Sequence, residues 1–79
     1  SITTMNALAA NGITKAISDL STVDNCAATL KGAEQNIRAI IAAADEVREL
    51  SVDTTALRLM LEELLKIHEK KWYLLQLQE

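Results

Sequence analysis

The chain has 79 residues, which is enough for one small domain over residues 1–79 and too short for two. Hydrophobic residues make up 49% of it, aromatic residues only 3%, and proline is absent, a composition that favours helices over strands. The net charge of −3 argues against nucleic acid or an anionic membrane as the main partner. The single cysteine excludes an internal disulfide, and one cysteine with one histidine cannot supply a structural zinc site.

The first expected helix covers about residues 3–20. Its apolar side chains recur at steps of three and four residues, as on one face of a helix. They are Ile2, Met5, Leu8, Ala9, Ile13, Ala16, Ile17 and Leu20. Asn11-Gly12 interrupts this pattern with a turn signal, and a glycine inside a helix costs about 1 kcal/mol relative to alanine. The segment is therefore either one helix kinked at this point or two short helices.

The second expected helix covers about residues 22–50 and has the most regular pattern in the chain. Ser21 or Thr22 can serve as its N-cap, and Asp24 places a negative charge in its first turn. Apolar or small residues then recur along the helix, with steps that alternate between three and four residues. This spacing makes an unbroken heptad seam. The seam consists of Val23, Cys26, Leu30, Ala33, Ile37, Ile40, Ala44 and Val47. Such a seam predicts coiled-coil-like packing against a neighbouring helix.

The third expected helix covers about residues 53–78, and Ser51 or Asp53 can cap its start. Its main stripe, which is mostly apolar, consists of Leu57, Met60, Leu61, Leu64, Ile67, His68, Lys71, Leu74 and Leu75. The connection from the second helix is short, and a short connection makes the two helices antiparallel neighbours.

These elements predict an all-α fold. Two long, coiled-coil-like helices form an antiparallel helical hairpin, and a shorter N-terminal helix packs on it to complete a three-helix bundle. A domain of this size buries only about 60% of the surface that its unfolded chain exposes, so its core is marginal. With no disulfide or metal to stabilise it, self-association is the remaining way to complete the core, and we expect a homodimer.

The residue types that most often carry chemistry have structural explanations in this chain. Cys26 lies on the heptad seam, where a buried cysteine behaves as a small hydrophobe. His68 begins the sequence His-Glu-Lys-Lys, which lacks the second histidine of a His-Glu-x-x-His zinc motif, and we expect it at the edge of the core or in a capping role. We therefore expect no catalytic residue, cofactor, metal or small-molecule substrate, and a protein that is not an enzyme.

The end of the third helix points to a protein partner. Residues 72–77 are apolar nearly all round, and a helix of that kind is normally buried on more than one side. Tryptophan and tyrosine are enriched among the residues that dominate binding interfaces. The candidate partner-binding residues are Leu59, Trp72, Tyr73 and Leu77. They suggest a small interaction or regulatory module that binds through helix–helix contacts.

Nucleic-acid binding is the alternative hypothesis. Lys66, Lys70 and Lys71 form a basic cluster next to Trp72, and positive charge beside an aromatic ring is typical of single-strand binders. The same lysines are also explained as solvated cations near the C-terminal end of a helix, where the helix dipole favours them.

The expected location is the cytoplasm. The N-terminus lacks the basic segment of a secretory signal, and the longest apolar run, residues 39–44, is far too short to span a bilayer. The size is typical of small bacterial or phage-encoded accessory proteins.

Overall fold

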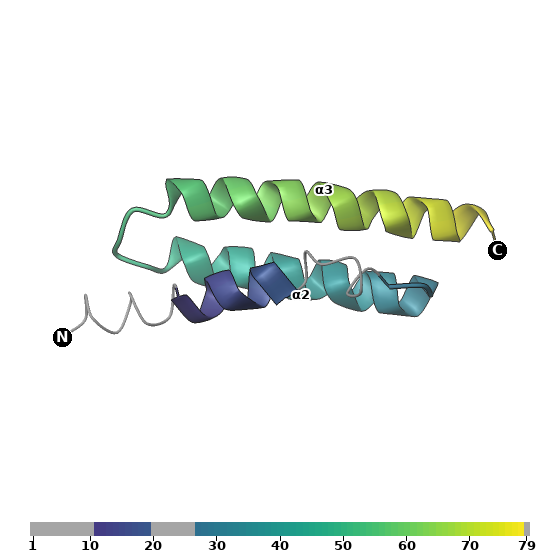
Figure 1. Ribbon diagram of the computed structural model, residues 1–79, viewed down its shortest axis with the longest axis horizontal. Coiled ribbons are helices and arrows are strands. Elements are labelled where there is room, and N and C mark those ends of the chain that lie inside the picture. The colour runs from purple at the N-terminus through teal and green to yellow at the C-terminus, as the bar shows by residue number, and fades with distance from the viewer. Residues whose placement is uncertain (1–10, 20–26, 79) are drawn as a thin grey trace.

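The computed structural model describes residues 11–19 and 27–78, and all regular structure in these residues is helical. Residues 11–19 form the described part of the first helix, α2 spans Leu30–Arg48 and α3 spans Thr55–Leu77 (Figure 1). The predicted all-α class with three helices is therefore confirmed for these residues. In this part of the chain, no helix is both long enough and apolar enough to cross a membrane.

The first helix contributes two side chains to the core. Ile13 and Ile17, one turn apart, are 8% and 2% exposed, whereas Ala16, predicted on the same face, is exposed. Asn11 and Gly12 are both helical. The rest of the predicted helix, residues 3–10 and 20, lies outside the described residues.

The start of α2 differs from the prediction. Thr29 is the N-cap: its hydroxyl oxygen accepts a hydrogen bond from the backbone N–H of Gly32 at 3.1 Å, and its carbonyl oxygen accepts one from Ala33 at 2.9 Å. Residues 27–29 are not helical, so the predicted start near residue 22 is wrong. A side-chain oxygen on Thr29 satisfies an N–H group of the first turn, and this fixes where the helix begins. The caps and first-turn charge predicted from the sequence lie outside the described residues; they are Ser21, Thr22 and Asp24.

The connection between α2 and α3 covers residues 49–54 and ends in a capping interaction. The Oδ1 atom of Asp53 accepts hydrogen bonds from the backbone N–H and the hydroxyl of Thr55, at 3.1 and 2.8 Å. The backbone hydrogen bond first, then the hydroxyl bond and the charge of Arg58, hold the pKa of the Asp53 carboxyl below its ordinary value of 3.8. The N-cap of α3 is Thr54, which makes no side-chain capping bond, so neither predicted cap, Ser51 or Asp53, occupies that position. Asp53, one residue earlier, supplies the carboxylate that accepts the backbone N–H of Thr55 in the first turn.

The core lies between the three helices. α2 and α3 lie side by side and run in opposite directions (Figure 1). The buried cluster draws on all three helices and consists of Ile13, Ile17, Ile40, Val47, Leu61 and Leu64. Every predicted seam residue from Leu30 to Val47 is buried or half-buried, so the periodicity predicted for this stretch is confirmed. The first two seam residues, Val23 and Cys26, lie outside the described residues.

On α3 the buried row is narrower than the predicted stripe. The residues that face the core recur at alternating steps of four and three, and we call them the inner seam: Leu57, Leu61, Leu64, His68, Lys71 and Leu75. The prediction is wrong at Met60, Ile67 and Leu74, which are 45%, 50% and 45% exposed. Each of these three precedes an inner-seam residue, and one residue step turns a side chain by about 100° around the helix, away from α2.

His68 lies in the core rather than at its edge. It is 1% exposed, the most buried polar residue among those described. No buried side-chain nitrogen or oxygen in residues 11–19 and 27–78 lacks a hydrogen-bond partner, so the imidazole is accommodated as a satisfied polar group.

Candidate interaction surface

A second row of side chains runs along α3, one position before the inner seam. We call it the outer seam: Ala56, Met60, Glu63, Ile67, Lys70, Leu74 and Leu77. It has the same alternation of four- and three-residue steps, but every member is exposed. α3 therefore carries two adjacent heptad seams, and α2 and the first helix bury only one of them.

The partner-binding residues predicted from the sequence fall on two sides of α3. Leu59, Tyr73 and Leu77 are 58%, 54% and 66% exposed, and they lie on or beside the outer seam. Trp72 is half-buried and projects on the side that faces α2. By helical geometry it lies about 140° around the axis from Leu77, so Trp72 does not share one binding surface with the other three residues.

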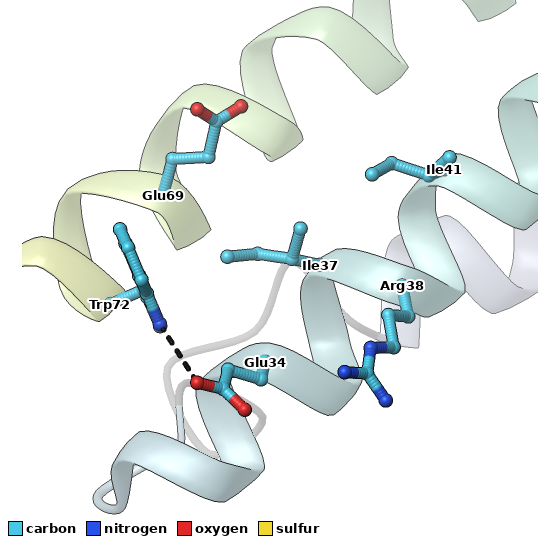
Figure 2. Close-up of a pocket in the computed structure, with 6 residues that line it drawn as sticks. All are labelled: Glu34, Ile37, Arg38, Ile41, Glu69 and Trp72. Atoms are coloured by element: carbon cyan, nitrogen blue, oxygen red, sulfur yellow. Dashed lines mark hydrogen bonds between the residues drawn. The ribbon is translucent and has the colours of Figure 1, made fainter.

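Trp72 makes a contact within the chain. Its ring Nε1–H donates a hydrogen bond to Oε1 of Glu34 at 3.3 Å, which joins the second half of α3 to the first half of α2. Figure 2 shows the indole reaching from α3 toward Glu34, with Ile37 beside them. The residues around this bond line an open hollow of about 350 Å³ between the helices, with Ile41 and Glu69 at its margin (Figure 2).

The hollow beside Trp72 is continued along the two helices by a smaller one. A hollow of about 190 Å³ lies between α2 and α3 and is also lined by Ile41, together with Ala44, Leu61 and Leu65. Its margins carry both signs of charge: Asp45, Arg48, Arg58 and Glu62. Together the two hollows form a shallow apolar groove with mixed charges at its margins, separate from the outer seam.

The first helix borders the outer seam without covering it. Ile17 lines a third hollow, of about 350 Å³, together with Met60, Glu63 and Ile67. Met60 and Ile67 remain about half exposed beside it. The outer seam was not predicted as a surface of its own, although the seven-residue spacing of Met60, Ile67 and Leu74 is visible in the sequence.

The lysines of the nucleic-acid hypothesis do not form one surface with the tryptophan. Lys66 and Lys70, four residues apart on the same side of α3, are exposed, whereas Lys71 belongs to the inner seam and is half-buried. Lys70 and Trp72 are about 160° apart around the helix axis. The stacking ring and the exposed positive charges therefore point in different directions.

The described residues contain no cluster that could hold a metal ion. Within residues 11–19 and 27–78, no group of three or more His, Cys, Asp or Glu side chains is placed to hold a metal ion. His68 is enclosed by the core, and Cys26 lies outside the described residues.

Comparison with known proteins gives no family for this chain. No family model, curated protein or solved structure matches it.

Proposed function

We propose that this protein is a non-enzymatic interaction module that binds through helix–helix contacts and associates with itself. In this proposal α2 and α3 act as an antiparallel, coiled-coil-like hairpin, and α3 presents its outer seam to a protein partner or a second copy. The observation that carries the proposal is the row of exposed apolar side chains on α3.

The exposed large hydrophobic side chains gather on one helix. Among the described residues, Ile41 lies on α2 and all the others lie on α3: Leu59, Met60, Ile67, Tyr73, Leu74 and Leu77. Single exposed hydrophobic residues are ordinary on protein surfaces, but a contiguous apolar patch marks an interaction site. A helix with apolar side chains on two sides is normally covered on both.

The size of the chain supports self-association as the form of this interaction. A 79-residue domain has a marginal core, and small domains commonly add stability by oligomerisation. Tyr73, half exposed near the end of α3, is of a residue type enriched at the centres of interfaces.

Molar mass by light scattering after size exclusion, over a hundredfold range of concentration, tests the proposal. We expect a mass above the 8.7 kDa of one chain that rises with concentration. The triple variant Leu59→Ser, Tyr73→Ser, Leu77→Ser should return to the mass of one chain while its circular dichroism stays helical. Ile41→Ser is the matched control, because it removes an exposed hydrophobic residue from the groove and should leave association intact. If the unaltered chain had the mass of one chain at every concentration, the self-associating form of the proposal would be wrong. Association that persisted in the triple variant would mean that these three residues do not form the contact.

Nucleic-acid binding remains the second candidate, supported by the two exposed lysines on one side of α3, Lys66 and Lys70. Binding through these contacts should weaken steeply with added salt, because counterions are released from the phosphates. Titration of labelled single- and double-stranded oligonucleotides at low salt tests it. Absence of binding at micromolar protein would eliminate this candidate.

A further inference from the structure

The outer seam contains two charges of opposite sign near its middle. Glu63 and Lys70 are both exposed and are seven residues apart, about 10.5 Å along the helix. That distance is too long for an ion pair between them within one α3. Apolar side chains flank the two charges, with Met60 on one side and Leu74 and Leu77 on the other. The seam therefore has Ile67 at its centre, a negative charge on one side of it and a positive charge on the other, and apolar ends.

This order makes the outer seam complementary to itself. If two α3 helices pair antiparallel about a point near residues 66–67, Glu63 of each copy lies near Lys70 of the other, and the contact occurs twice. Leu59 of one copy then lies near Leu74 of the other. Parallel pairing would instead place Glu63 against Glu63 and Lys70 against Lys70, and like charges in a shared seam oppose association.

We infer that the occupant of the outer seam is a second copy of this chain, bound antiparallel through α3 with a two-fold axis near residues 66–67. This inference rests on the proposed function and deepens it, because it names the partner, the surface and the direction of pairing. Charged residues inside a seam specify orientation and register but lower the affinity. The dimer should accordingly dissociate on dilution.

Charge exchange between Glu63 and Lys70 tests the pairing. Glu63→Lys alone and Lys70→Glu alone each put like charges together at two symmetric places, so each should weaken association roughly fivefold or more. The double variant, Glu63→Lys with Lys70→Glu, restores opposite charges across an antiparallel interface and should recover association to within about twofold. Both side chains are exposed on the single chain, so the helical signal should be unchanged in all three variants. Sedimentation or light scattering over a concentration series measures the dimer dissociation constant.

Disulfide trapping tests the direction of pairing independently. In a Cys26→Ser background, Leu59→Cys and Leu74→Cys are prepared as separate chains and then mixed under mild oxidation. Antiparallel pairing should give mainly mixed dimers that contain one chain of each kind, whereas parallel pairing would give dimers of like chains. Cysteine at Ile41 in the same background is the matched control, because it is similarly exposed but lies in the groove, and it should form few disulfides.

The outcomes separate this inference from the proposed function. Rescue by the charge exchange, together with mixed 59–74 disulfides, supports the antiparallel dimer. If the double variant fails to restore association, or if the disulfides join like chains, the inference is wrong and self-association still stands. Trapping through the Ile41 position would place the second copy in the groove and overturn the inference in the same way. A chain with single-chain mass at every concentration would overturn both.

Discussion

The inner and outer seams of α3 are nearly matched in composition and opposite in their surroundings. Each is mostly apolar and each contains two polar residues: His68 and Lys71 in the inner seam, Glu63 and Lys70 in the outer. They are displaced by a single residue along the chain. Even so, every inner-seam side chain is buried or half-buried, and every outer-seam side chain is exposed.

The difference shows that burial on α3 is decided by its neighbours rather than by its own residues. Ile40 and Val47 of α2, with Ile13 and Ile17 of the first helix, meet the inner seam and form one cluster with it. The same apolar periodicity, turned by about 100°, is bordered by Ile17 at Met60 and Ile67, but both of these side chains stay about half exposed. An apolar row of this kind can fold the chain or bind a partner, depending on what packs against it.

The largest expected effect on stability comes from replacing one leucine by alanine in each seam. Leu64 is 2% exposed and Leu74 is 45% exposed. Leu64→Ala should lower the free energy of unfolding by about 2–5 kcal/mol, because it removes buried methyl groups and leaves a cavity. Leu74→Ala should change it by only about 0.5 kcal/mol or less in the dissociated chain, because that side chain is already half solvated. Urea titration followed by circular dichroism, in protein dilute enough to be monomeric, measures both values.

The same two leucine variants can also show that the two seams do not differ in this way. A loss of 2 kcal/mol or more for Leu74→Ala in monomeric protein would mean that the outer seam is packed within one chain, and that it is not free for a partner. A negligible loss for Leu64→Ala would mean that the inner seam does not hold the helices together.

The neighbouring aromatic residues provide a smaller version of the same contrast. Trp72 donates a hydrogen bond to Glu34, whereas Tyr73 is 54% exposed on the other side of the helix. Trp72→Phe removes the N–H donor and part of the ring, so it should cost about 1 kcal/mol of unfolding free energy. Tyr73→Phe should cost almost nothing in the monomer. Thermal unfolding by circular dichroism compares the two, and equal losses would mean that the Trp72–Glu34 contact contributes no stability.

The sequence predicted the core-facing side of α2 and misjudged that of α3, for a physical reason. On α2 most apolar residues outside the seam are small alanines, so periodicity identifies Ile40 and Val47 as buried, and only the exposed Ile41 is a large apolar residue off the seam. On α3 apolar residues occupy adjacent positions, as in Met60-Leu61, and both members fit a helical stripe. Which member faces inward depends on where α2 and the first helix lie, and that information is tertiary.

The start of α2 was missed for a similar reason. Several hydroxyl residues precede the helix, and each is a chemically adequate N-cap. The heptad pattern continues back to Val23, which favoured an early start. The actual cap, Thr29, is distinguished by a contact that periodicity does not encode: its hydroxyl oxygen accepts a hydrogen bond from Gly32. On α3 the sequence singled out Leu59, Tyr73 and Leu77, which are exposed, but it did not separate the row of the outer seam from the inner one.

The two glycines also differ in whether the space around them is free or filled by neighbouring atoms. A β-carbon on Gly12 would meet nothing within 4 Å, whereas one on Gly32 would lie 2.9 Å from the β-carbon of Ala27 and 3.0 Å from the capping hydroxyl of Thr29. Gly12→Ala should therefore raise the free energy of unfolding by about 0.5–1 kcal/mol, through better helix propensity. Gly32→Ala has the same gain in propensity but must displace the cap, which is worth about 1 kcal/mol, so it should give no net gain. Similar stabilisation by both substitutions in urea titration would show that the Thr29 cap is dispensable.

The smallest expected effect lies at Asp53, an exposed residue that accepts two hydrogen bonds from Thr55 at the start of α3. Its hydrogen bonds to Thr55 lower the pKa of its carboxyl, so the folded state favours the charged form. The stabilisation is then fully present above the ordinary value of 3.8 and is lost as the pH falls through the lowered value of the folded chain. Asp53→Ala should reduce the thermal midpoint slightly at pH 7, and this difference should shrink below pH 3.8 as the carboxyl of the unaltered chain is protonated. Thr54→Ala is the control, because Thr54 makes no side-chain capping bond. A deficit for Asp53→Ala that stayed constant into acid would show that the charge on the carboxyl contributes nothing to capping.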